Sequence, residues 1–136
     1  MKKKKNKKNK YNARKVVFDG IKFDSEKELK RWLELKDQEE CEVISNLRRQ
    51  VEYVLIPNQY AESTEVYKKG KKKGQPKQGK LLERKLSYVA DFVYTDATGK
   101  TIVEDVKGYR GGQAYSAYKI KRKLMLYIHG IKIYEF

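Results

Sequence analysis

The stretch SYVADFVYTDATGKTIVEDVKG, residues 87–108, decides the fold of this chain. Residues 87–95 predict a β-strand, because their side chains alternate between two faces with a period of two. One face carries Tyr88, Ala90, Phe92 and Tyr94, and the other carries Val89, Asp91 and Val93. Residues 96–99 predict a turn and residues 101–107 the next strand, so the whole stretch predicts an antiparallel hairpin.

The turn predicts the register of this hairpin. If pairing begins at Asp96 around a three-residue loop, Gly99 takes the left-handed conformation that such loops require. Asp91 then lies directly opposite Asp105, with the two Cβ atoms about 4.5–5.5 Å apart. A slip of one residue would place Asp91 opposite Glu104 instead, and would weaken the inference that follows.

Two carboxylates at this separation repel each other, and one is driven toward protonation unless a cation lies between them. Asp105 and Lys107 are two residues apart and share a face of the sheet, whereas Glu104 points to the opposite face. Lys107 alone would leave the two acids with a net negative charge. Because Mg²⁺ commonly takes one or two protein carboxylates together with water and phosphate, the facing pair Asp91 and Asp105 predicts a metal site.

Spacing alone leaves an alternative open, which is a ladder of Asp and Lys side chains on a half-exposed sheet. Such exposed charge pairs are common and contribute little free energy. The acid-Xaa-Lys pattern is also weak by itself, because 38% of the chain is charged.

A helix is expected upstream, from Ser25 to about residue 40. Ser25 is a good N-cap, and Glu28 three residues later completes a capping box. Glu28 also lies on a stripe with Trp32 and Leu35, at the rim of the helix face that is buried. Capping by a bond back to the Ser25 backbone and a role as a site carboxylate are both open for Glu28.

Three other segments predict strands, and one predicts a loop. Residues 15–23 contain an Asp-Gly pair between apolar runs, which is a strong hairpin signal. Residues 43–56 are rich in Val, Ile, Leu and Tyr, and residues 131–136 predict a final strand. Residues 57–80 hold Gly, Pro, Gln and Lys without periodicity, which predicts a long loop that is functional or disordered.

A second helix is expected over residues 115–129, with Gly130 as its C′ residue. Its predicted inner face comprises Ala117, Ile120, Leu124, Tyr127 and Ile128. His129 at the helix end favours the helix dipole, and we expect it to cap rather than to catalyse. The order of elements predicts an α/β (α+β) fold, with a mixed central β-sheet flanked by helices.

The formal net charge of +15 is concentrated in two segments. Residues 1–15 carry nine Lys or Arg and no acid, and residues 68–85 carry nine more against one acid, Glu83. We expect residues 1–12 to be a disordered basic tail, followed by a single domain over 13–136 with a Lys-rich loop at about 57–85. A nucleic acid is the partner that this distribution favours, with a solubilising charge run as the alternative.

Several classes of protein are disfavoured by composition. No run of about 18 apolar residues exists, so we expect no membrane span. The basic N-terminus has no apolar segment behind it, so it does not resemble a signal peptide. Cys41 is the only cysteine, which excludes an internal disulfide and fits a reducing cytoplasm.

Residues 88–92 and 103–108 together resemble the paired motifs of the PD-(D/E)XK nuclease superfamily. The segment 23–28 resembles the acidic first helix of the branch that includes transposon-end-cutting nucleases and archaeal junction resolvases. Over about residues 11–136 the chain is similar to a family of small, largely uncharacterised phage and prophage proteins. Ala90 departs from the Pro in the superfamily name. The resemblance implies a restriction-endonuclease-like core and a phage- or prophage-encoded protein of the bacterial cytoplasm.

The resemblance also implies roles for individual residues. Asp91, Asp105 and Glu28 would bind Mg²⁺ or Mn²⁺, and Lys107 would orient or activate the attacking water and neutralise charge on the phosphate. Gln50 falls where related nucleases carry a polar site residue. Independently of the resemblance, Tyr118 lies near Arg110 in the sequence and could stack on a base, with packing in the core as an equal alternative. The expected nucleic-acid-binding residues are Lys68, Lys69, Lys71, Lys72, Lys73, Lys119, Lys121, Arg122 and Lys123.

These observations favour a divalent-metal-dependent endonuclease that hydrolyses phosphodiester bonds in DNA, with branched or junction DNA as a substrate that the resemblance suggests. The alternative is a non-catalytic nucleic-acid-binding protein on the same fold. A protein-binding regulator is a third hypothesis, and it predicts no salt-dependent affinity for DNA. Nucleases of this size often act as dimers, so a homodimer stays open, although no sequence feature marks an interface.

Overall fold

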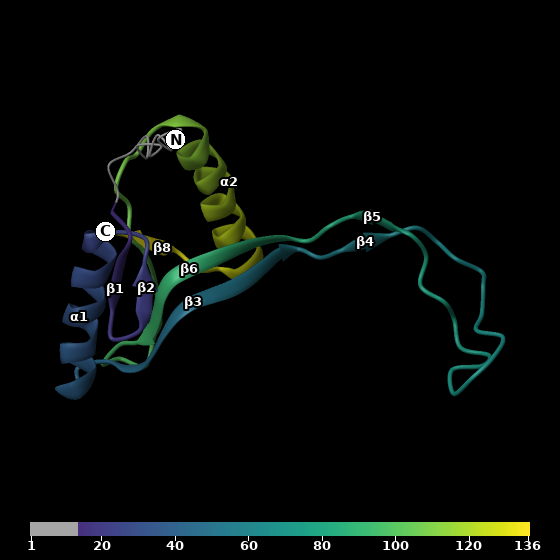
Figure 1. Cartoon of the computed structure of the whole chain (residues 1–136), viewed down its shortest axis with the longest axis horizontal. Coiled ribbons are helices and arrows are strands. Elements are labelled where there is room, and N and C mark those ends of the chain that lie inside the picture. Colours follow the sequence, from purple (N-terminus) through teal and green to yellow (C-terminus); the bar gives the residue numbers. More distant parts are fainter. Residues whose placement is uncertain (1–13) are drawn as a thin grey trace, which may run out of the picture.

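The computed structural model describes residues 14–136, and the basic tail expected over residues 1–12 lies outside them. A central sheet carries one helix near each face, and a long arm extends away from this body (Figure 1). The predicted class, a mixed α+β fold with a central sheet and flanking helices, is confirmed.

The N-terminal hairpin forms as predicted, from β1 (Val16–Phe18) and β2 (Ile21–Phe23). Asp19 has a φ of 49° and Gly20 a φ of 75°, which is the left-handed pair that a tight turn of this type requires. The hairpin leads directly into α1 (Glu26–Glu40), whose N-cap is Ser25. The Ser25 hydroxyl accepts a hydrogen bond of 3.1 Å from the Glu28 amide, as the capping signal predicts.

The central sheet has the strand order β3-β6-β7-β8. Its strands are β3 (Ser45–Ile56), β6 (Leu86–Thr95), β7 (Thr101–Asp105) and β8 (Ile133–Glu135). The first three are antiparallel neighbours, and β8 runs parallel to β7 at the edge.

The predicted register of the β6–β7 hairpin is confirmed. Thr95 pairs with Thr101 and Phe92 with Glu104, and Gly99 has the expected left-handed φ of 84°. Strand β7 ends at Asp105 rather than two residues later. The chain nevertheless continues its pairing beyond that point, because the amide of Lys107 donates to the carbonyl of Phe136 at 2.6 Å.

The two faces of the sheet have separate apolar cores. On one face Phe92 and Tyr94 pack against Leu35 of α1, and on the other Tyr88 and Ala90 pack with residues of α2. The prediction that Tyr88, Ala90, Phe92 and Tyr94 share one face was therefore wrong. The alternation of side chains between the two faces breaks between Ala90 and Phe92. At this point the neighbouring strand β3 carries Gln50, which has a positive φ.

Helix α2 (Gly112–His129) begins three residues earlier than predicted and ends at Gly130, which has the expected φ of 66°. Its predicted inner face was wrong. Tyr118 and Met125 are the buried residues of this helix, whereas Ile120 is exposed and Tyr127 is 88% exposed. Apolar residues lie on several sides of this helix, so periodicity alone does not identify the side that packs.

His129 lies at the end of α2 as expected, and its Nε2 is 2.8 Å from the carbonyl oxygen of Val54 on β3. This contact joins the C-terminal end of α2 to the C-terminal end of β3. Neither α1 nor α2 contains an apolar stretch of the length that a bilayer crossing requires.

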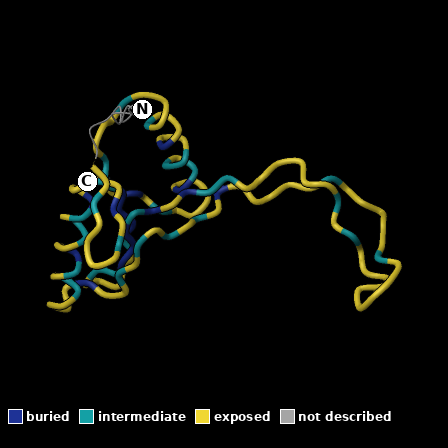
Figure 2. The backbone as a smooth tube through the Cα atoms, viewed as in Figure 1, coloured by how far each residue is buried: buried dark blue, intermediate teal, exposed yellow. Residues whose placement is uncertain are grey.

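Residues 57–80 are largely a long loop, as predicted, and they form most of an extended arm. Within them Gln59–Tyr60 forms the short strand β4, which pairs with β5 (Leu81–Glu83) on the returning segment. Further backbone hydrogen bonds continue toward the tip, from Ala61 to Lys80 at 2.8 Å and from Lys77 to Glu65 at 2.9 Å. The arm is almost entirely exposed along its length (Figure 2). It continues directly from the ends of β3 and β6 (Figure 1).

The packing of α1 can be tested with two leucines of the same helix. Leu35 is 0% exposed and Leu33 is 43% exposed. We expect Leu35→Ala to lower the free energy of unfolding by about 3 kcal/mol, because the truncation leaves a cavity under α1. Leu33→Ala should cost less than about 1 kcal/mol. Urea unfolding of both variants measures the difference, and equal losses would contradict this packing.

Candidate active site between β6, β7 and α1

Two carboxyl groups from neighbouring strands form the centre of the candidate site. Asp105 on β7 is 5% exposed, and Asp91 on β6 accepts a hydrogen bond of 2.8 Å from the amide of Val106. Burial, together with the hydrogen bond and charge of Asp105, raises the pKa of Asp91 to about 7. The two carboxyl groups therefore face each other as the register predicts, and they compete for one proton.

Lys107 lies on the same side of the sheet as the two acids. Its Nζ is 2.5 Å from Oδ2 of Asp105 and 3.5 Å from the centroid of the Tyr118 ring. A lysine held between a carboxylate and the face of an aromatic ring is fixed in position while keeping its charge. The carbonyl of Lys107 accepts a hydrogen bond of 2.7 Å from Nζ of Lys27 on α1, which ties this strand end to the helix.

Glu28 brings a third carboxylate to the site from the first turn of α1. It is 4% exposed, and burial is the largest cause that raises its pKa, while the amide of Asp24 lowers it. One oxygen accepts the Asp24 amide at 2.9 Å, and the other lies 3.5 Å from Nε2 of Gln50. The predicted bond to the Ser25 backbone is replaced by the bond to Asp24, and one oxygen remains directed toward the site.

Gln50 connects Glu28 to the pair of aspartates, which supports its prediction as an accessory residue. Its Nε2 donates to Oδ1 of Asp91 at 3.3 Å and to Glu28 at 3.5 Å. Gln50 also has a φ of 50°, in the left-handed region that a non-glycine residue rarely adopts inside a strand. Such local strain is concentrated at functional sites, where the surrounding structure holds it in place.

The geometry also contains residues that were not predicted. Nη2 of Arg49 is 3.5 Å from Glu28, and its guanidinium lies 4.3 Å above the ring of Phe23. The Tyr88 hydroxyl is buried near Asp105, and burial with that nearby charge raises the pKa of Tyr88. Neither residue has a sequence signal, because Arg and Tyr are abundant in this chain and only the fold brings these two beside acids.

A pocket of about 370 Å³ lies between β6 and α2, and Asp105, Lys107 and Tyr118 form part of its lining. Tyr118 is buried and its hydroxyl donates to Glu135 at 3.0 Å. Its ring is therefore engaged with Lys107 rather than presented for stacking on a base.

The four basic residues predicted on α2 have different surroundings. Lys121 lines the pocket beside the site, whereas Arg122 pairs with Glu135 at 2.6 Å. Lys123 lines a separate hollow next to β8, and Lys119 lies 5.5 Å from the ring of Tyr115. Of these four, Lys121 is the one that the fold brings to the pocket of Asp105 and Lys107.

The five predicted lysines of the arm lie away from the site, and all are exposed. They are Lys68, Lys69, Lys71, Lys72 and Lys73.

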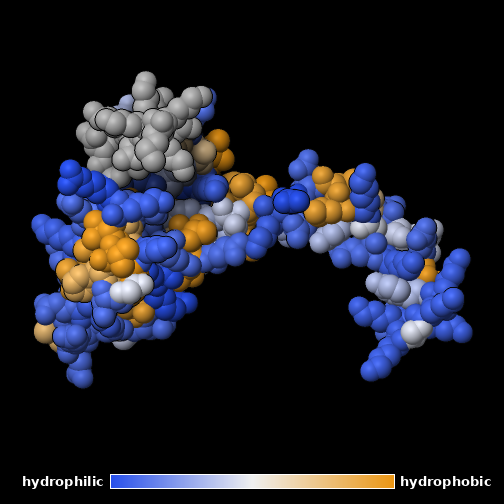
Figure 3. Space-filling view, in the orientation of Figure 1, coloured by the Kyte–Doolittle hydropathy of each residue, from blue (hydrophilic) through white to orange (hydrophobic). Residues whose placement is uncertain are grey.

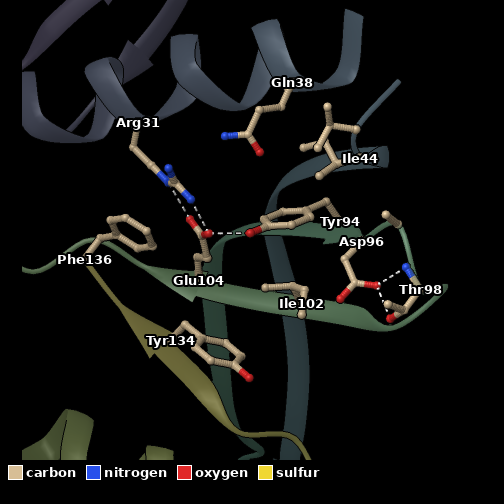
Figure 4. A pocket seen from close by; sticks show the side chains of 12 residues that line it. Arg31, Gln38, Ile44, Tyr94, Asp96, Thr98, Ile102, Glu104, Tyr134 and Phe136 are labelled. Atoms are coloured by element: carbon tan, nitrogen blue, oxygen red, sulfur yellow. Dashed lines mark hydrogen bonds and ion pairs between the residues drawn. The ribbon is translucent and has the colours of Figure 1, made fainter. Parts of the chain in front are cut away.

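A second pocket, of about 550 Å³, lies on the opposite face of the sheet between α1 and β7 (Figure 4). Arg31 reaches from α1 to Glu104 with two hydrogen bonds, of 2.9 and 2.6 Å. The Tyr94 hydroxyl also donates to Glu104. Glu104 therefore points to the opposite face, as predicted, and its charge is already satisfied within the protein. This pocket has the larger volume but not the unbalanced charge that a catalytic site needs.

The acids of the candidate site fit an ion that keeps most of its own water. Within residues 14–136 no group of three or more His, Cys, Asp or Glu side chains is arranged as a complete metal cage. Mg²⁺ is commonly held by one or two carboxylates, with water and substrate phosphate as its other ligands. Asp91 and Asp105 supply such a pair, and the raised pKa of Asp91 marks a place where a cation would relieve repulsion.

The pKa of Asp91 predicts how stability depends on pH. The folded protein keeps this proton to about pH 7, whereas the unfolded chain releases it near the ordinary pKa of about 4. The free energy of unfolding should therefore fall as the pH rises from about 4 to 7, with no further loss above pH 7.

Asp91→Asn removes this titration, so the variant should gain stability relative to wild type across the same window. Urea unfolding at several pH values, without divalent ions, measures the difference. Parallel pH profiles for the two proteins would show that Asp91 does not hold a raised pKa.

The candidate site lies entirely within the part of the chain that matches a family model. The model is described as Protein of unknown function (DUF1064), and it matches residues 8–130. No curated protein and no solved structure matches the chain. Because the family match extends over most of the sequence, the chain belongs to the family described as Protein of unknown function (DUF1064).

Proposed function

We propose that the protein is a divalent-metal-dependent endonuclease of the PD-(D/E)XK kind that hydrolyses phosphodiester bonds in DNA. The observation that carries the proposal is the pair Asp91 and Asp105, which face each other from adjacent strands with Lys107 beside them. Two acids that face each other at short range, one of them buried, next to one lysine at a pocket, form a group suited to binding a cation and an anion together.

Asp91 and Asp105 would hold Mg²⁺ or Mn²⁺, and Glu28 would contribute through the oxygen that lies near Gln50 and Arg49, directly or through a bridging water. When bound, such an ion supplies Lewis-acid stabilisation of the phosphate and favours ionisation of a nearby water. Deprotonation of Asp91 is required before it can bind a cation, so cleavage should increase as the pH rises through about 7.

Lys107 would act on the water and on the phosphate from a fixed position. Its contacts with Asp105 and with the ring of Tyr118 hold Nζ at the wall of the pocket. From there it would orient the attacking water and neutralise the charge that develops on the phosphate oxygens. Tyr118 is then a positioning residue for Lys107, and Gln50 is one for Asp91 and Glu28.

A nucleic acid as the substrate is supported by the charge that surrounds these acids. Lys121 lines the same pocket, and the arm carries a dense run of exposed lysines. Phosphates attract such side chains over a distance, because each contact releases counterions from the DNA. Cleavage of a branched duplex, compared with supercoiled plasmid, tests whether the substrate is branched DNA.

We expect Asp91→Ala, Asp105→Ala and Lys107→Ala each to reduce DNA cleavage by at least about 100-fold, since each removes a group that acts in the transition state. Supercoiled plasmid and a branched duplex, incubated with Mg²⁺ or Mn²⁺, provide the assay. Asp96→Asn in the turn of the same hairpin is the matched control. It should retain cleavage because Asp96 does not line the pocket of Asp105 and Lys107, and because asparagine keeps the side-chain oxygen that accepts from Thr98 and Lys100.

Binding measured in parallel separates the two function classes. If wild type binds DNA but cleaves none of these substrates with either metal, the protein is a non-catalytic DNA-binding protein and the endonuclease proposal is wrong. If cleavage persists in the Asp91 and Lys107 variants, the chemistry belongs to another site.

A further inference from the structure

The arm has no apolar core of its own to account for its shape. Almost every residue between Pro57 and Lys85 is exposed, and the two chain segments are joined by backbone hydrogen bonds. An isolated two-stranded ribbon is only marginally stable in water. Its length is therefore better explained by something that it binds than by a contribution to folding.

The outer part of the arm is strongly basic. Residues 66–80 contain seven lysines and no acid, and the end of the arm is hydrophilic over its visible surface (Figure 3). Apart from Val66, the exposed large apolar residues of the arm, which include Leu81 and Leu82, lie nearer the body. The charge is thus placed at the far end, away from the acids of the candidate site.

A two-stranded ribbon fits one groove of duplex DNA. The major groove of B-form DNA is about 12 Å wide and admits a two-stranded ribbon, whereas the minor groove is about 6 Å wide. In A-form RNA the major groove is too deep and narrow for side chains to read. Lysines along such a ribbon would meet the phosphates on both sides of the groove, which positions the protein without selecting a base sequence.

The number of residues between Asp91 and the lysines of the arm limits how far from the acids the arm can contact DNA. Strand β6 carries Asp91 and runs back into the arm, with Lys80 eleven residues away and Lys72 nineteen residues away. At about 3.3 Å per residue these positions lie up to about 36 and 63 Å along the ribbon. At about 3.4 Å per base pair, that range corresponds to about 11–19 base pairs. The arm bends (Figure 1), so these values are upper bounds.

We infer that the arm lies in the major groove of duplex DNA, up to one to two helical turns from the phosphate held at Asp91 and Asp105, and grips it without regard to sequence. The distance from a cut phosphate rests on the proposed endonuclease function, but binding by the arm does not. The substrate class is therefore a duplex that extends about 20 base pairs to one side of the site.

The test uses the full chain and a series of linear DNA duplexes from 8 to about 40 base pairs, with binding measured without divalent ions so that cleavage plays no part. The arm variant replaces five lysines by glutamine, namely Lys68, Lys69, Lys71, Lys72 and Lys73. Its matched control makes the same change at five exposed lysines of the body, namely Lys15, Lys22, Lys30, Lys100 and Lys132.

For wild type and the control, affinity should rise with duplex length up to about 20–30 base pairs, whereas the arm variant should reach its plateau on shorter duplexes. On long duplexes we expect the arm variant to bind about 30-fold more weakly, with a log–log salt slope lower by about 3–4. Circular dichroism checks that each variant is folded.

Dimethyl sulfate distinguishes the grooves, because it modifies guanine N7 in the major groove and adenine N3 in the minor groove. Wild type should protect guanine N7 in a region that the arm variant leaves reactive, and duplex RNA of equal length should not compete for the arm-dependent part of the affinity.

The inference is wrong if the arm variant and the control have the same length dependence, if protection falls on adenine N3, or if duplex RNA competes equally. Arm-dependent binding with no cleavage would leave this inference standing and remove the endonuclease proposal. Cleavage in the absence of arm-dependent binding would remove this inference and leave the endonuclease proposal standing.

Discussion

Repulsion between two carboxyl groups, the buried Asp105 and the half-buried Asp91, is the constraint on which the rest of this site depends. Asp91 and Asp105 are held opposite each other by the register of β6 and β7, and the cost appears as a raised pKa for Asp91. The surroundings reduce this cost without removing it, through the amide of Val106 and the ammonium group of Lys107. A protein that only needed stability would be better served by an apolar pair here. The repulsion that remains between Asp91 and Asp105 is the physical reason to regard this site as functional.

The buried acids on the two faces of the sheet have different partners. On the α1 face, Glu104 is fully satisfied by Arg31 and Tyr94, so the ion pair is part of the packing. On the α2 face, Asp105 has a lysine that is shared with the ring of Tyr118, next to a second acid. Neighbouring residues of one strand therefore serve structure and chemistry separately, because alternation sends them to opposite sides.

The body contains the apolar cores, and the arm carries exposed basic charge. Both apolar cores lie between the sheet and its helices, whereas the arm is exposed and basic. The arm is nevertheless continuous with β3 and β6, the strands that carry Gln50 and Asp91. This continuity limits how far from the acids a molecule bound to the arm can lie. It therefore links the proposed binding by the arm to the proposed chemistry at the acids.

The sequence by itself determined the elements whose signals are local. The Asp-Gly and Asp96–Gly99 turns, the Ser25 cap and the register that sets Asp91 against Asp105 follow from neighbouring residues, and the structure confirms each of them. Tertiary structure alone decided which side of α2 packs, that residues 57–80 extend as an arm, and that Arg49 and Tyr88 meet the acids. The reason is physical: these contacts join residues far apart in the chain, and their energies arise from burial and charge that exist only after the sheet and helices have assembled.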